Sequence, residues 1–117
     1  AHHAACDVPV FPSLYEAFGI VALEAMSMEK PVVVGAVGVS GMRESVIARG
    51  PDQCGFHIDP RNLPSIASGI VNAVQDPERR AELGRNGRRR VFREFSWDVA
   101  AKNTVKMYHE VLRSTSA

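Results

Sequence analysis

Two glutamates, Glu16 and Glu24, are separated by seven residues and follow a short apolar run at residues 7–12. Apart from Glu24, residues 17–26 are all apolar or glycine. An ionised carboxylate in such a segment is costly to bury unless hydrogen-bond donors or a cation satisfy it. Vicinal hydroxyls of a sugar or ribose are suitable donors, because one carboxylate can accept from both. The pair of acids therefore indicates a site that binds hydroxyl groups.

The segment between the acids is suited to a phosphate. Glu16 lies in the turn after a strand, and Gly19 helps to open a helix that we expect over residues 17–28. The backbone N–H groups of a helix's first turn have no partner within the helix, so they bind anions. Two hydroxyl-binding acids on either side of a phosphate-binding turn predict a nucleotide-sugar site.

Each acid also has a structural interpretation, which the residues alone leave open. Glu16 near a helix N-terminus would stabilise the helix dipole by about 0.3–1 kcal/mol. Glu24 would be satisfied by an arginine from elsewhere in the chain.

The sequence around the acids resembles a known family, the retaining GT-B glycosyltransferases of family 4. Residues 11–26 look like the E-x7-E signature of that family. The similarity continues through residues 30–34, 41–44, 54–59 and 95–97, so it covers nearly the whole chain. Carboxylates are common, and the surrounding sequence rather than the bare spacing therefore carries the resemblance.

The resemblance implies a role for each matching residue. Glu16 resembles the acid that contacts the hydroxyls of the donor sugar, and it would act in catalysis by orienting the substrate. Glu24 resembles the acid that holds the ribose hydroxyls of the nucleotide. Phe18, Gly19 and Ile20 match the turn whose backbone amides face the donor sugar and its phosphates.

A glycine loop, with Gly35, Gly38 and Gly41, follows the second expected strand. Its regular spacing differs from the G-x-G-x-x-G fingerprint of dinucleotide-binding proteins. In the family this loop faces the donor site, so the resemblance implies that Gly38 and Gly41 lie near the donor. A tight strand-to-helix connection is the alternative, and the loop departs from the family's commoner Gly-Gly pair.

The reaction implied by the resemblance is transfer of a sugar from a nucleoside-diphosphate sugar to a sugar, lipid or other hydroxyl acceptor, with retention of anomeric configuration. It needs no cofactor and no obligatory metal. We expect residues 1–117 to be the C-terminal portion of a cytoplasmic enzyme's donor-binding domain. The N-terminal acceptor domain and the first part of the donor-binding domain would precede it, and the chain alone would be inactive.

Two other classes of function stay open. A sugar-nucleotide epimerase or a phosphorylase of the same architecture would use the same nucleotide- or phosphate-binding site for different chemistry. A non-catalytic sugar-nucleotide-binding module would keep the fold without the reaction, although the presence of both Glu16 and Glu24 argues against it.

The composition is that of an ordinary globular domain, with 117 residues, 45% hydrophobic and 23% charged. A net charge of +1 gives no general attraction to nucleic acid or to anionic membranes. Cys6 and Cys54 are expected to be buried, reduced thiols. His2, His3 and Cys6 lack a fourth partner of recognised spacing, so no metal site is expected.

The chain alternates expected strands and helices, which predicts an α/β fold. The expected architecture is a partial Rossmann-like parallel sheet flanked by helices, with a helical C-terminus. Pro9 indicates a bulge or a sheet-edge position. The expected strands are residues 7–11, 31–35 and 55–58. The first two expected helices are residues 17–28 and 42–47. Three further helices are expected to begin after Asn62, at Asp76-Pro77 and after Ser96.

Apolar periodicity predicts which faces of the last three helices are packed. In the arginine-rich helix, Arg85, Arg89 and Arg93 share a solvent face; peripheral contact with an anionic membrane is the alternative for it. The opposite, packed face holds Leu83, Gly87 and Val91. The stripe after Asn62 is Leu63, Ile66, Ala67, Ile70, Val71 and Val74. The last stripe, which we expect to lack part of its packing surface, runs from Trp97 through Ala100, Ala101, Thr104, Val105, Tyr108 and Val111 to Leu112.

Overall fold

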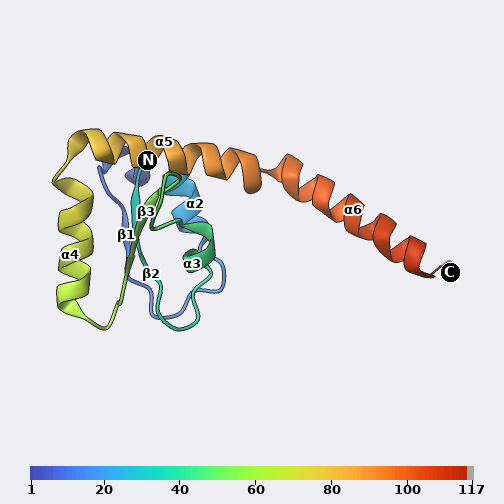
Figure 1. The fold of residues 1–117 in the computed structure, drawn as a ribbon, viewed down its shortest axis with the longest axis horizontal. Helices are drawn as coiled ribbons and strands as arrows, with labels where there is room; N and C mark the ends of the chain where they lie inside the picture. The colour runs from blue at the N-terminus through green and yellow to red at the C-terminus, as the bar shows by residue number, and fades with distance from the viewer. Residues whose placement is uncertain (116–117) are drawn as a thin grey trace.

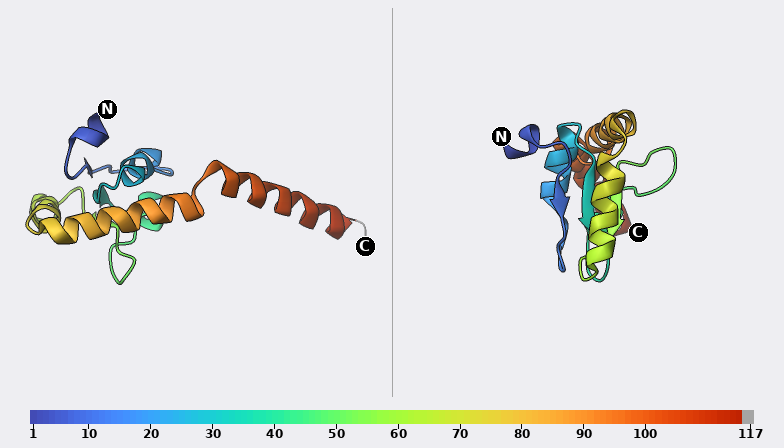
Figure 2. Two further views of the ribbon diagram at one scale, coloured as in Figure 1. Left: turned by 90° about the horizontal axis from the view of Figure 1, so that it is seen from above. Right: turned by 90° about the vertical axis from the view of Figure 1, so that its left-hand side faces the viewer.

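The computed structural model describes residues 1–115. Strands and helices alternate along the chain, and the last helix extends away from the rest of the molecule (Figures 1 and 2). The elements are α1 (His2–Ala5), β1 (Val10–Phe11), α2 (Ile20–Ser27), β2 (Val32–Gly35), α3 (Met42–Ser45), β3 (Gly55–Ile58), α4 (Leu63–Val74), α5 (Pro77–Glu94) and α6 (Trp97–Thr115).

The three strands form a parallel sheet in the order β1-β2-β3. The strand β1 begins at Val10, later than the expected residue 7, because Pro9 has no N–H to donate to a ladder. The Pro9 carbonyl still accepts a hydrogen bond from Val33 N–H at 3.0 Å. In the sheet formed by the described residues β1 is an edge strand, which is one of the two alternatives that Pro9 indicated.

The helix α2 begins three residues later than expected, at Ile20 instead of residue 17. Gly19 precedes it with φ 84° and ψ 49°, a left-handed conformation that interrupts the helical path. The expected helix over residues 42–47 is also shorter, since Val46 is extended, with φ −104° and ψ 114°.

The core lies on both faces of β2, whose four residues are all buried. Val32 and Val34 belong to a cluster that includes Met26 of α2. Val33 points to the other face, where it packs with Ile58 in a second cluster. This alternation follows from the two-residue period of a strand, and it explains why β2 reads as a continuous valine run.

The packed face of α4 differs from the predicted stripe. Gly69 and Ala73 are its buried residues, whereas Leu63 is 79% and Val71 is 53% exposed. A Cβ added at Gly69 would lie 2.5 Å from Ile58 Cγ2, so only small residues fit where the helix meets the sheet. Ala67 and Val74 of the predicted stripe are exposed too, and Ile66 and Ile70 are half-buried.

Of the two C-terminal helices, α5 packs through the predicted face, whereas the predicted stripe of α6 is exposed. In α5, Leu83 and Gly87 are buried, and Arg85, Arg89 and Arg93 are exposed. In α6, Trp97 is 91% exposed, and its described residues include no buried one. No helix among residues 1–115 is long and apolar enough to cross a membrane.

The cysteines are free thiols, with Cys54 buried and Cys6 half-buried. Within residues 1–115, no group of three or more histidine, cysteine and acidic side chains is arranged to hold a metal ion.

Candidate functional site

The loop that carries Glu16 is joined to the glycine loop through backbone hydrogen bonds. Glu16 N–H donates to the Val39 carbonyl at 3.1 Å, and Gly41 N–H donates to the Glu16 carbonyl at 2.9 Å. Glu16 and Ser40 thereby form an isolated parallel bridge. These loops follow β1 and β2, and the carboxyl ends of neighbouring parallel strands are where α/β proteins bind ligands.

Two glycines make this close approach possible. A Cβ at Gly41 would lie 2.5 Å from the Ala17 carbonyl oxygen and 2.7 Å from Phe18 Cα. Gly19 has a positive φ, and a Cβ there would collide with the side chain of Met42. The starts of α2 and α3 therefore pack closely against each other at Gly19 and Gly41. Any larger residue at either position would force the neighbouring atoms to move.

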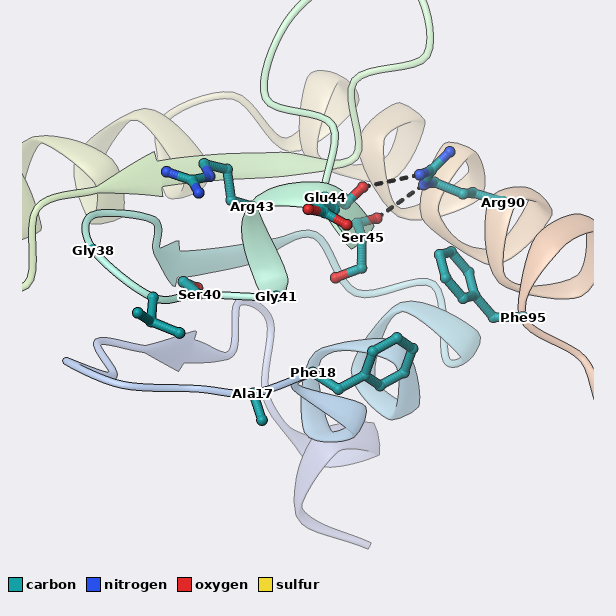
Figure 3. A pocket seen from close by; sticks show the side chains of 11 residues that line it. Ala17, Phe18, Gly38, Ser40, Gly41, Arg43, Glu44, Ser45, Arg90 and Phe95 are labelled. Carbon is teal, nitrogen blue, oxygen red and sulfur yellow. Dashed lines mark hydrogen bonds between the residues drawn. The ribbon is translucent and has the colours of Figure 1, made fainter.

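A hollow of about 530 Å³ opens between the two loops, α3 and the end of α5 (Figure 3). Three predicted site residues, Phe18, Gly38 and Gly41, line it. The rest of the lining is Ala17, Val39, Ser40, Arg43, Glu44, Ser45, Arg90 and Phe95. We call this the polar hollow.

A second hollow, also of about 530 Å³, lies on the α6 side of Phe18. It contains two further predicted residues, Ile20 and Glu24, and its other lining residues are mostly apolar. They are Leu23, Ser27, Val91, Glu94, Phe95, Trp97, Ala100 and Asn103. Phe18 and Phe95 are the residues shared by both hollows, and their rings meet edge to face with centroids 6.2 Å apart.

The Glu24 carboxylate is accessible and not buried. Its side chain is 59% exposed, while Leu23 and Ala25 on either side of it are buried. The desolvation argument made from the apolar segment therefore does not apply, because the helix turns this one residue outward. The arginine partner considered as an alternative is absent from the described residues, and the nearest basic group is His3 Nε2, at 3.7 Å from Glu24 Oε2.

The structure thus divides the predicted site residues into two groups. The backbone of Glu16 is fixed beside Gly41, and Phe18, Gly38 and Gly41 line the polar hollow. Ile20 and Glu24 lie along the first two turns of α2, facing the second hollow. Among the described residues, Glu16 and Gly19 line neither hollow. The ligand-binding roles of these residues remain predictions.

The polar hollow includes residues that sequence reasoning did not single out. Glu44 and Phe95 lie in segments that carry the family resemblance, so a signal for them existed. Arg90 had none, because its partners are carbonyl groups of α3 more than forty positions earlier in the chain. Helical periodicity grouped the arginines of α5 by face but did not indicate this contact.

Comparison with known proteins supports the family resemblance. The sequence profile described as "Glycosyl transferases group 1" matches residues 1–90. An uncharacterised glycosyltransferase of Methanocaldococcus jannaschii is 41% identical over 106 residues, which cover 91% of this chain and 26% of that protein.

Solved structures share the fold. Sucrose-phosphate synthase from Thermosynechococcus elongatus matches with a TM-score of 0.82 and 34% identity, over 97% of this chain and 27% of that one. Anabaena HepE, solved in complex with UDP and glucose, matches with a TM-score of 0.73 and 29% identity, over 97% of this chain and 29% of that one.

The chain spans about a quarter of the length of the relatives it matches. The predicted fold class, a parallel α/β sheet flanked by helices with a helical C-terminus, is confirmed. The chain belongs to the glycosyl transferases group 1 family.

Proposed function

We propose that this chain is the C-terminal portion of the donor-binding domain of a retaining glycosyltransferase. The enzyme would transfer a sugar from a nucleoside-diphosphate sugar to a hydroxyl acceptor in the cytoplasm. The acceptor domain and the remaining donor-binding residues belong to the upstream part of the same protein. A relative of the same fold, HepE, was solved with UDP and glucose, which supports a donor of this chemical class.

The observation that carries the proposal is the junction of the Glu16 loop with the glycine loop. Hydrogen bonds to Val39 and from Gly41 hold the backbone of Glu16 at the carboxyl ends of β1 and β2. Glu24 lies one turn after the start of α2 with its carboxylate exposed. One acid is thus fixed in a loop and the other is presented from a helix, with the first-turn amides of α2 between them.

In this proposal the two acids have different tasks. Glu24 accepts hydrogen bonds from the ribose hydroxyls and contributes to binding in the ground state. Glu16 accepts from hydroxyls of the transferred sugar, where charge develops as the glycosidic bond breaks. The backbone amides of Phe18, Gly19 and Ile20 face the sugar and phosphates, and basic groups upstream complete the phosphate site.

A donor panel tested on the full-length protein would examine this proposal. A nucleoside-diphosphate sugar that binds the folded state raises the melting temperature, and the best donor is then incubated with candidate hydroxyl acceptors. A glycoside product with retained configuration supports the proposal. Release of free nucleotide without a glycoside, or interconversion of donor sugars, would instead indicate a hydrolytic or an epimerase activity.

Glu24→Gln and Glu16→Gln remove one charge each, and Glu29→Gln is the matched control. Glu29 follows α2 and is also exposed, but it pairs with Arg88 at 3.9 Å, away from both hollows. We expect the first two variants to lose donor affinity or turnover and the control to keep both. Equal behaviour of all three variants would remove the basis for the proposed roles.

A further inference from the structure

Arg90 of α5 lines the polar hollow, and all three nitrogens of its guanidinium group contact neighbouring groups of the protein (Figure 3). Nε donates to the Ser45 carbonyl at 2.9 Å, and an Nη donates to the Glu44 carbonyl at 3.0 Å. The other Nη pairs with Glu94 at 2.7 Å. With its side chain only 15% exposed, Arg90 is held among these partners and is not presented to a ligand.

The first set of contacts fixes the C-terminal end of α3. The last carbonyls of a helix have no partner within it, and a cation there is favoured by the helix dipole. Because α3 has only four residues, these carbonyls lie one turn from its start. The two ends are linked directly, since Ser45 N–H donates to the carbonyl of the N-cap residue Gly41 at 3.2 Å. Holding the Glu44 and Ser45 carbonyls therefore also holds Gly41, whose N–H donates to Glu16.

The second set of contacts runs through aromatic rings. The Arg90 guanidinium carbon lies 5.4 Å from the centroid of the Phe95 ring, within the range of a cation–π contact. Phe95 meets Phe18 edge to face. Phe18 belongs to the turn between the two acids, so this route reaches the same loop from the opposite side of the hollow.

We infer that Arg90 is a positioning residue for the donor site, which it sets through α3 and Gly41 on one side and through Phe95 and Phe18 on the other. The expected effect of Arg90 on donor binding rests on the proposed function. The placement of the loops by Arg90 is a separate physical statement. The two parts can be measured separately.

The substitution that tests the inference is Arg90→Lys. A lysine ammonium keeps the positive charge beside Glu94, but it lacks the planar fork that reaches two carbonyls and a carboxylate at once, and it loses the flat face over Phe95. Arg89→Lys is the matched control. Arg89 is the adjacent arginine, and its guanidinium bonds within α5, to Asn86 Oδ1 at 2.6 Å.

Three quantities are measured on the full-length protein: the melting temperature, amide hydrogen exchange at Glu16 and Gly41, and donor kinetics. We expect Arg90→Lys to melt close to wild type while its Glu16 and Gly41 amides exchange about tenfold faster, as local opening becomes easier. We expect the KM for the donor to rise by about tenfold, because the loops are no longer held in the binding geometry. Arg89→Lys should match wild type in all three.

The outcomes separate the two statements. If Arg90→Lys behaves like Arg89→Lys in exchange or in KM, the positioning role is wrong. A higher KM with unchanged exchange would mean direct contact with the ligand, and a variant unfolded at the assay temperature would mean a general structural role; either result overturns the inference. If the wild type transfers no sugar while exchange responds only to Arg90→Lys, the proposed function fails and the placement of the loops by Arg90 stands.

Discussion

Gly41 N–H donates a hydrogen bond of 2.9 Å to the carbonyl of Glu16, although the two residues lie in different loops of the chain. The contact requires glycine, because the backbone of Ala17 and Phe18 occupies the space where a Cβ would be. The position of the first acid of the E-x7-E motif therefore depends on a residue in the next strand–helix connection.

Gly41→Ala should destabilise the protein by about 1–3 kcal/mol, since its Cβ forces a backbone shift in a packed region. Gly38→Ala is the control: Gly38 has φ 79° but open space around a Cβ, so the cost is conformational only, about 1 kcal/mol. Denaturant unfolding of both variants measures the difference. A Gly41→Ala loss no larger than that of Gly38→Ala would contradict the close packing described for this loop.

The fold was predictable because its signals are local. The valine run at Val32–Gly35 predicts a buried parallel strand, and Asn62 and Asp76 predict helix starts. Asn62 Oδ1 accepts from Ser65 N–H at 3.1 Å and Asp76 Oδ1 accepts from Arg79 N–H at 3.0 Å, as caps do. Pro9 likewise indicated a bulge or an edge position for β1.

What the sequence did not predict depends on contacts between distant segments. The predicted stripe of α4 was only partly right: Ile66 packs against the second core cluster, but the buried residues are Gly69 and Ala73. Apolar periodicity assumes that large side chains face the sheet, whereas Gly69 lets the helix approach Ile58 closely. The site residues were found through the resemblance, but their division between two hollows follows from the orientation of α2. Nothing local to Arg90 indicates its bonds to Glu44 and Ser45.

Glu24→Ala should weaken donor binding by about 1.5–3 kcal/mol, the scale of charge-assisted hydrogen bonds. The fold should be unaffected, because the side chain is 59% exposed and its pairing with His3 is long, at 3.7 Å. Titration calorimetry with the donor and a thermal melt test the two statements together. A variant that binds donor like wild type but melts much lower would show that Glu24 is structural.

Glu16→Ala should lower turnover while the free nucleoside diphosphate still binds nearly as in wild type. The reason is that contacts to the sugar strengthen in the transition state and so appear mainly in kcat. The backbone hydrogen bonds of Glu16 do not need its side chain, so the loop should keep its place. Parallel loss of nucleoside-diphosphate and sugar-donor binding would count against the assignment.

The buried Cys54 thiol should react slowly with a thiol reagent in the folded protein, and the half-buried Cys6 faster. Burial raises the pKa of Cys54 above its ordinary value of 9.0. The unfolded state therefore releases this proton first, so the contribution to stability is complete below pH 9.0 and declines as the pH rises further. Labelling rates of the wild type and of Cys54→Ala separate the two thiols, and denaturant unfolding of both proteins at neutral and alkaline pH measures the loss of stability. Equal rates for both thiols would contradict the burial.

The 117-residue chain alone should show no transferase activity. In the sheet of the described residues β1 is a two-residue edge strand, whereas doubly wound domains typically have about five or six strands.

The apolar stripe of α6 is exposed as well, with Trp97 91% and Tyr108 64% exposed, which favours self-association of the isolated chain. Sedimentation analysis should therefore detect oligomers, and Trp97→Lys should reduce them.

The same chain should bind a nucleoside-diphosphate sugar weakly, because in our proposal Glu16 and Glu24 need phosphate-binding groups from outside residues 1–117 to complete the site. Donor titration and product analysis on the purified chain test this, with Glu16→Ala as the control for any activity found. Glycosyl transfer by wild-type residues 1–117 that Glu16→Ala abolishes would show that these residues form a complete active site, and the proposal that upstream residues complete the site would then be wrong.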